Sequence, residues 1–117
     1  MNGINNIFNA IDHFDPESFA SHFTDNASFK FGNADMVFGR DNIKDAVTNF
    51  FSAIKAIEHS IENNWVVDKH VFIQGQVTYT RHNDTRLTVP FANILEMNGD
   101  KVATYQIYAD ISRLFAT

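Results

Sequence analysis

The sequence predicts an α+β fold in which three helices cover one face of a strongly curved antiparallel sheet. The first indication is a change of apolar period along the 117 residues. Apolar residues recur every three or four positions in the first half and every second position in the second half. The second indication is the short turn between consecutive strands, which joins antiparallel neighbours. Such a sheet has one apolar face to bury, and helices on that side bury it.

Three helices are predicted, all in the first half of the chain. The second helix has the clearest start, because Asp15 is a typical N-cap and Pro16 suits the first helical position. Phe19 and Phe23 give this helix a buried face, and it is predicted to end near Thr24. The first and third helices follow from apolar stripes at helical spacing. The predicted ranges are 4–11, 16–24 and about 40–55.

The strands are predicted from strict alternation of apolar and polar residues. One short strand, 27–31, stands between the second and third helices. The later strands cover about 57–67, 70–82, 86–97 and 101–111. We expect a single domain over 1–117, because this length suits one core and no linker, repeat or low-complexity segment interrupts it.

Composition argues against several classes of function. The net charge is −5 and the basic residues are scattered, so we expect no nucleic-acid partner. The chain has no cysteine, which removes disulfides and thiolate chemistry. It shows neither a signal-peptide pattern nor an apolar run long enough to span a membrane, so we expect a cytoplasmic protein without a membrane partner. The five histidines lack paired ligand spacing, and no metal site is predicted.

Four segments together resemble a known family. They are FDPESFASHFTDNASFKF, FGRDNIKDAVTNFF, HSIENNW and VTYTRHNDTRLTVPFANILEMNGDKVATYQIYAD. Their order and spacing are similar to those of the SnoaL-like and ketosteroid-isomerase-like branch of the nuclear transport factor 2-like superfamily, over nearly the whole chain. The resemblance implies a cone-shaped sheet whose mouth is closed by helices around an apolar pocket.

The resemblance also implies a homodimer formed through the outer face of the sheet. Alternation gives that face an uncharged, β-branched character that suits packing against a second copy. The residues assigned to it are Thr78, Thr80, Thr88, Asn93, Thr104, Gln106 and Tyr108.

The best-known reactions of the superfamily lack their residues here. The position of the general base of ketosteroid isomerase resembles Phe31, which cannot take a proton. The two oxyanion donors of that enzyme fall near Ile7 and Ala92. Arg81 resembles the arginine of limonene epoxide hydrolase, but the residue two further on is Asn83 where that enzyme needs an acid. The resemblance therefore does not identify a reaction.

Side-chain parity gives the candidate site. If Phe31 faces inward, the same alternation turns Tyr79, Arg81 and Tyr105 inward, together with Ala92 and Ile94. Asp110 falls on the opposite face. The alternation of HSIENNW places His59, Asn63 and Trp65 inward as well. The predicted ligand-binding residues are Phe31, Asn63, Trp65, Tyr79, Arg81 and Tyr105.

His59 is the candidate catalytic residue. The His-x-x-x-Asn spacing of His59 and Asn63 is similar to that of a strand in SnoaL-like and scytalone-dehydratase-like proteins, where a pocket histidine acts as acid or base. The alternative is a structural imidazole that is hydrogen-bonded to Asn63 or Tyr105.

Two functions follow from these residues. The first is a cofactor-independent isomerase, cyclase or dehydratase that acts on a hydrophobic oxygenated compound such as a polyketide, a steroid-like molecule or a terpenoid. In this function Tyr79 or Tyr105 holds a developing oxyanion. The alternative is a non-catalytic ligand-binding or dimeric association module.

Overall fold

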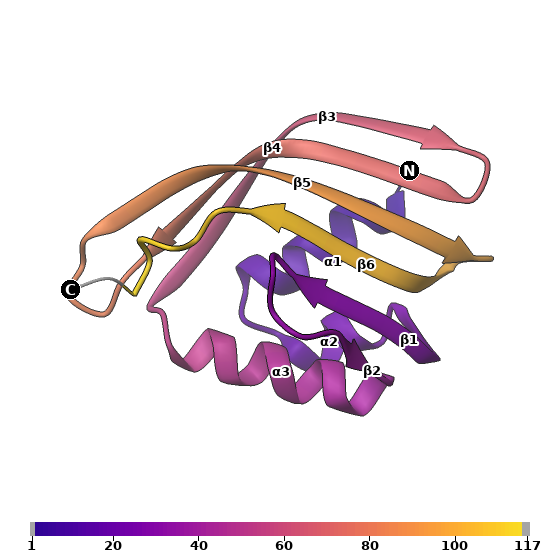
Figure 1. Cartoon of the computed structure of the whole chain (residues 1–117), viewed down its shortest axis with the longest axis horizontal. Coiled ribbons are helices and arrows are strands. Elements are labelled where there is room, and N and C mark those ends of the chain that lie inside the picture. The colour runs from indigo at the N-terminus through magenta and orange to yellow at the C-terminus, as the bar shows by residue number, and fades with distance from the viewer. Residues whose placement is uncertain (1, 116–117) are drawn as a thin grey trace.

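The computed structural model describes residues 2–115, which form three helices and six strands. Along the chain these are α1 (Asn2–Asp12), α2 (Pro16–Ala20), β1 (Phe23–Phe31), β2 (Val37–Phe38), α3 (Arg40–Ser52), β3 (Ala56–Val67), β4 (His70–Thr80), β5 (Arg86–Asn98) and β6 (Lys101–Ala109). All strands belong to one sheet in the order β2-β1-β6-β5-β4-β3. In Figure 1 this sheet curves above the helices. No helix within the described range has the length and apolarity needed to cross a bilayer.

The second helix is shorter than predicted. Asp15 is its N-cap, as expected, because its side chain accepts a hydrogen bond from the backbone N–H of Ser18 at 3.0 Å. The helix ends at Ala20, however, and Phe23 is the first residue of β1. Pairing with β6 replaces the helix there, and Phe23 lies opposite Val102 in that pairing. The prediction of a helical Phe23 was wrong, although the side chain is fully buried.

The sheet is mixed, whereas a purely antiparallel sheet was predicted. β1 runs parallel to β6. After β1 the chain passes through α3 to the far edge of the sheet and returns through the antiparallel strands β3, β4 and β5. β6 then arrives beside β1 in the same direction (Figure 1). The two-residue β2, which pairs with β1, was also not predicted.

Aromatic side chains fill part of the space beneath the sheet. Phe19 of α2 packs against Phe23 with 4.9 Å between ring centroids and against Tyr105 with 5.7 Å. Phe29 lies 5.5 Å from Tyr105. All four rings are buried, so α2, β1 and β6 share one apolar cluster.

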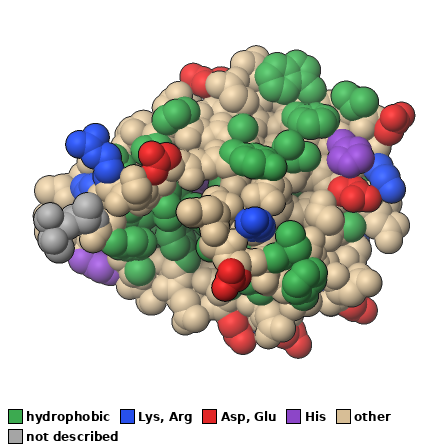
Figure 2. All heavy atoms as spheres, in the orientation of Figure 1, with side chains coloured by type: hydrophobic (Ala, Val, Ile, Leu, Met, Phe, Trp, Pro, Cys, Tyr) green, Lys and Arg blue, Asp and Glu red, His purple; other side chains and the backbone are tan. Residues whose placement is uncertain are grey.

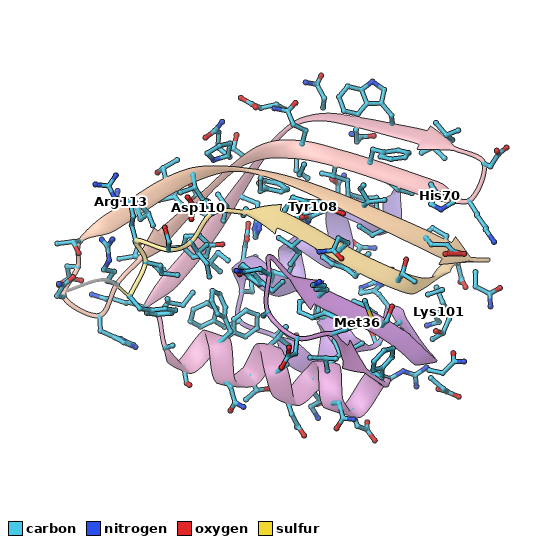
Figure 3. All side chains as sticks on the ribbon, viewed as in Figure 1. Met36, His70, Lys101, Tyr108, Asp110 and Arg113 are labelled. Carbon is cyan, nitrogen blue, oxygen red and sulfur yellow. The ribbon has the colours of Figure 1, made fainter. Side chains whose placement is uncertain are left out.

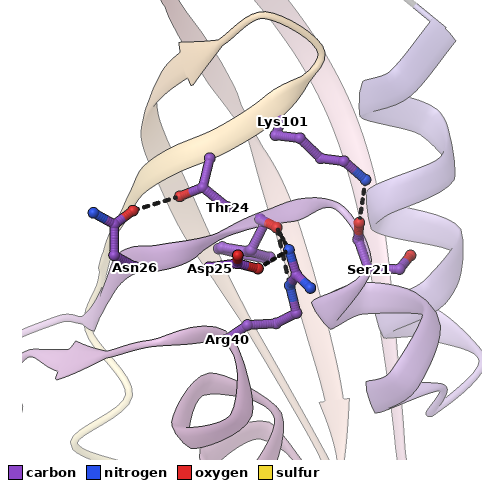
Figure 4. A network of polar contacts seen from close by, with 7 residues as sticks. Ser21, Thr24, Asp25, Asn26, Arg40 and Lys101 are labelled. Carbon is purple, nitrogen blue, oxygen red and sulfur yellow. Dashed lines mark hydrogen bonds and ion pairs between the residues drawn. The ribbon is translucent and has the colours of Figure 1, made fainter.

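A polar network ties the start of β1 to two later elements (Figure 4). Arg40, the first residue of α3, donates from Nη2 and Nε to the carbonyl oxygen of Phe23 at 2.9 and 3.1 Å, and its Nη2 lies 2.7 Å from Asp25. Lys101 donates to the carbonyl oxygen of Ser21 at 2.7 Å. These contacts fix the entry of β1 between α3 and β6.

A β-bulge interrupts the pairing of β3 with β4. Ile61 pairs with Gly75 and Asn63 pairs with the preceding residue of β4, so Glu62 is an extra residue. The backbone of β3 lies very close to β4 at this point. A Cβ atom on Gly75 would lie 2.1 Å from the carbonyl oxygen of Ser60. Only glycine fits beside the bulge.

We expect Gly75→Ala to destabilise the protein by roughly 2 to 3 kcal/mol, because the backbone of Ser60 has to move away. Urea unfolding measures this loss. Gly99→Ala is the matched control, since no atom lies within 4 Å of its added methyl group. The control should lose about 1 kcal/mol through its positive φ alone. An equal loss in the two variants would contradict the close approach.

Candidate functional site

A cavity of about 470 Å³ lies between the sheet and the helices. Most of its wall is apolar and comes from all three helices and all six strands. Four predicted site residues lie in this wall, namely Phe31, His59, Tyr79 and Tyr105. The polar residues of the wall are Asn33, Asp35, His59, Tyr79, Asn93, Tyr105, Asp110 and Ser112.

His59 is held by a carboxylate. Nδ1 of His59 lies 2.7 Å from Oδ1 of Asp12, the last residue of α1. Oδ2 of Asp12 accepts a hydrogen bond from the backbone N–H of His59 at 3.1 Å. The imidazole packs edge-on against Phe8 and Phe91, with centroids 4.8 and 5.2 Å away. One oxygen of Asp12 thus holds the ring and the other holds the backbone of the same residue, while the two phenylalanine rings restrict rotation of the imidazole.

The contact with Asp12 determines what the imidazole can do. A carboxylate accepts hydrogen bonds and does not donate them, so Nδ1 carries the proton in the neutral ring. Nε2 is then the basic nitrogen. The side chains of His59 and Asp12 are 10% and 23% exposed, so the pair is largely removed from water. An oriented, partly desolvated imidazole that lines a cavity has the features of a general base.

Asp12 was not among the predicted site residues. The residue stands four positions after Phe8, which places it on the buried side of the first helix. That spacing was the available signal. The sequence did not indicate the partner, because His59 lies 47 residues away.

The two buried tyrosines are neutral hydroxyl groups. Burial raises the pKa of Tyr79 well above its usual value near 10. Burial also raises the pKa of Tyr105, and a hydrogen bond from Asn93 acts in the opposite direction. Nδ2 of Asn93 donates this bond to the Tyr105 hydroxyl at 3.2 Å. Asn93 itself is only 2% exposed.

Asn93 corrects the predicted parity of the fifth strand. The prediction turned Ala92 and Ile94 inward and put Asn93 on the outer face. In the structure Asn93 pairs with Ile73 and lines the cavity. Directly opposite residues of antiparallel strands share a face, and Ile73 is buried. The backbone hydrogen bond from Arg81 to Thr85 closes the turn that sets this register.

Asn63 and Trp65 lie outside the cavity, so their predicted inward position was wrong. The bulge at Glu62 reverses the face of every later residue in β3. Asn63 donates to the side-chain oxygen of Gln74 at 2.9 Å in an exposed contact. Trp65 is 53% exposed. A simple alternation from His59 therefore holds only as far as Ile61.

Arg81 is also absent from the cavity wall. Its guanidinium holds the segment after β6, because Nε donates to the carbonyl oxygen of Leu114 at 2.9 Å and Nη2 to that of Arg113 at 3.1 Å. Leu114 is 1% exposed. Arg81 therefore anchors the C-terminal segment, and its predicted inward position was wrong. The predicted strand extended to residue 82, which gave Arg81 an inward face. In the structure β4 ends at Thr80, so the alternation of faces does not reach Arg81.

That C-terminal segment forms one side of the cavity. The cavity is lined here by Ile111, Ser112 and Phe115, and the ring centroid of Phe115 lies 6.4 Å from that of Phe50. Asp110 lines it too, although alternation placed this residue on the opposite face. β6 ends at Ala109, and Figure 3 shows Asp110 beyond that end. Hydrogen bonds from Ser112 lower the pKa of Asp110, which keeps a negative charge at this exposed position.

No three potential metal ligands of the His, Cys, Asp and Glu types come together within residues 2–115. The Asp12–His59 pair has no third ligand of these types beside it in the described part of the chain.

Comparison with known proteins identifies the family. The profile of the SnoaL-like domain family matches residues 4–105. The chain belongs to this family. No curated protein sequence matches the chain significantly.

Several solved structures share the fold. A hypothetical protein with a ketosteroid isomerase-like fold from Catenulispora acidiphila, in complex with trimethylamine, superposes with a TM-score of 0.89 at 18% identity, over 97% of this chain and 89% of that one. A candidate SnoaL-like polyketide cyclase from Jannaschia sp. gives 0.83 at 14% identity, over 97% and 86%. TerC co-crystallised with polyporic acid gives 0.83 at 14% identity, over 97% and 92%. At these identities the likeness shows the nuclear transport factor 2-like fold.

We expect the stability of this SnoaL-like protein to fall as pH rises above about 10, because the unfolded tyrosines ionise there while Tyr79 and Tyr105 stay neutral. The stability that these two neutral hydroxyl groups contribute is present in full below about pH 10. It is lost as the pH rises toward the raised pKa values that the two tyrosines have in the folded protein. Urea unfolding at a series of pH values measures the slope, up to about 1.4 kcal/mol per pH unit for each group.

Tyr79→Phe and Tyr105→Phe should each flatten this slope. A slope equal to that of the native protein in both variants would contradict the burial of the two hydroxyl groups.

Proposed function

We propose that this SnoaL-like protein is a cofactor-independent enzyme that moves a proton on a hydrophobic, oxygenated small molecule, in an isomerisation, cyclisation or dehydration. The observation that carries the proposal is the 2.7 Å contact between Asp12 and His59 in the wall of an apolar cavity. That contact holds the imidazole of His59 in place, and it leaves Nε2 as the basic nitrogen.

His59 is the general base in this proposal, and Asp12 is its positioning residue. Nε2 of His59 takes a proton from a carbon or oxygen of the substrate, and Asp12 stabilises the resulting imidazolium ion. The same imidazolium can return the proton to another atom of the substrate, which completes an isomerisation, or to a leaving hydroxyl group, which completes a dehydration. Burial against Phe8 and Phe91 strengthens the Asp12–His59 interaction by excluding water.

Tyr79 stabilises the negative charge that develops on a substrate oxygen. Its phenol remains protonated at neutral pH, because burial raises the pKa of Tyr79. A neutral O–H group in an apolar cavity is an effective donor to an oxyanion. The substrate itself is largely apolar, since Phe31, Phe50, Val47 and Ile107 supply wall without hydrogen-bonding groups.

We expect the protein to open the ring of 5-nitrobenzisoxazole, a probe in which a base removes a carbon-bound proton while the N–O bond breaks to give a coloured phenolate. His59→Gln should reduce kcat/KM by roughly 100-fold and Asp12→Asn by roughly 10-fold, because the first removes the base and the second only its orientation. His13→Gln is the matched control, since His13 is exposed and contacts its own helix at Asn9.

Release of the phenolate is followed by absorbance, and binding is checked separately by a ligand-dependent thermal shift. A native rate equal to that of buffer, or an unchanged rate in His59→Gln, would contradict the enzymatic proposal.

A second function, binding without chemistry, is favoured by one observation. Phe31 stands where the resembling isomerase has its general base, and it packs against Phe50 with centroids 5.3 Å apart. A carrier would show saturable ligand binding that His59→Gln leaves intact, together with no acceleration of the probe reaction.

The outer sheet face supports a homodimer in this proposal. The hydroxyl groups of Thr78 and Thr88 bond each other at 2.8 Å, so this pair needs no water. Tyr108 and Trp65 are each 53% exposed. Figure 2 shows hydrophobic side chains gathered over the upper strands, and Figure 3 shows Tyr108 on β6. Exposed aromatic groups are typical of an interface core.

We expect a twofold dimer in solution at tens of micromolar protein, measured by light scattering. Tyr108→Glu should shift the population to monomer, because it places a charge in the apolar centre of the contact. Glu17→Gln, on the exposed side of α2, is a control that should leave the dimer intact. A monomeric native protein would refute the proposed association.

A further inference from the structure

We infer that Asn93 and Tyr105 form a subsite for a neutral hydroxyl group, so that the ligand is a hydroxylated apolar compound such as a phenol, an enol or an alcohol. The inference rests on the proposed ligand-binding cavity and adds the chemical group by which its ligand is recognised. It is independent of whether His59 performs catalysis.

The amide oxygen of Asn93 carries the inference. Asn93 lines the cavity and is 2% exposed. Its Nδ2 donates to the Tyr105 hydroxyl at 3.2 Å. Its Oδ1 is buried, and no donor of residues 2–115 lies within hydrogen-bonding distance. A buried acceptor without a donor is rare in folded proteins and carries a free-energy cost, which a donor on a ligand removes.

Asn93 and Tyr105 together present one hydrogen-bond donor and one acceptor to a ligand. Because the Tyr105 oxygen accepts the bond from Asn93, its own proton remains to be donated. Oδ1 of Asn93 is the acceptor. A ligand hydroxyl group can accept from Tyr105 and donate to Asn93 at the same time. A ketone or an ether can accept from Tyr105 but leaves Oδ1 without a donor.

Charge selects the neutral form of that ligand. An anionic ligand oxygen would face the partial negative charge of Oδ1. The field of the Asp12 carboxylate also reaches this place, since it is one of the causes that raise the pKa of Tyr105. Carboxylates and phenolates are therefore disfavoured, while a protonated hydroxyl group fits both partners.

Three naphthalene probes of similar shape test the inference. 2-Naphthol carries both donor and acceptor, 2-methoxynaphthalene carries an acceptor only, and 2-methylnaphthalene carries neither. Equilibrium dialysis at neutral pH measures the three dissociation constants. We expect the native protein to bind 2-naphthol about tenfold more tightly than either of the other probes.

Asn93→Leu keeps the approximate shape of the side chain and removes the amide. We expect it to abolish the roughly tenfold preference for 2-naphthol over 2-methylnaphthalene, while 2-methylnaphthalene still binds. Tyr105→Phe, which removes the other half of the subsite, should lower the same preference. Asn63→Leu is the matched control, because it makes the same change on the same sheet outside the cavity, and it should keep the native preference.

The outcomes separate the subsite from the cavity. Dissociation constants within about threefold for all three probes overturn the subsite and leave the ligand-binding cavity in place. Tighter binding of 2-methoxynaphthalene than of 2-naphthol overturns it as well, since the amide would then present its NH₂ group. No binding of any probe counts against the subsite and the proposed function together. If Asn93→Leu fails to fold, the native affinities and Tyr105→Phe decide the question.

Discussion

The register between β3, β4 and β5 determines which side chains face the cavity. His59 pairs with Val77, a buried residue of β4, and therefore faces inward. The bulge begins only after Ile61, and Gly75 permits the close approach of the backbones that the bulge requires. A bulge on the other side of His59 would turn the imidazole outward and separate it from Asp12. The polar part of the cavity thus depends on the absence of a side chain at position 75.

The sequence predicted the elements better than their pairing. Periodicity found α1, α3 and the four long strands, because each pattern is local. The inward face assigned to Tyr79 and Tyr105 was correct for the same reason. Tyr79 alternates regularly with Val77, and Tyr105 with Ile107, and all four side chains line the cavity. The parallel pairing of β1 with β6 was not predicted, because it depends on where the chain returns after α3 and not on any local pattern.

The site was predicted only in part, for related reasons. Asn63 and Trp65 were misplaced by one extra residue, and a bulge leaves little trace in a polar stretch such as Glu62 to Asn64. Asn93 was misplaced although a local signal was present, because it shares its parity with the buried residues Phe91 and Leu95 of the same strand. Asp12 acquires its role only through a contact with a residue 47 positions away. A single sequence constrains side-chain alternation well and long-range contacts poorly.

The proposed chemistry uses a part of the cavity other than the position of the acid in the resembling isomerase. Phe31 and Phe50 make that part of the cavity apolar. The ionisable pair instead spans the end of α1 and the edge strand β3, and Asp12 satisfies a backbone N–H of that edge strand with the oxygen that does not contact the ring. One carboxylate therefore contacts the backbone of the edge strand and orients the imidazole. Removing it would disturb both the strand and the imidazole, so the structure of the strand and the proposed reactivity are coupled at this position.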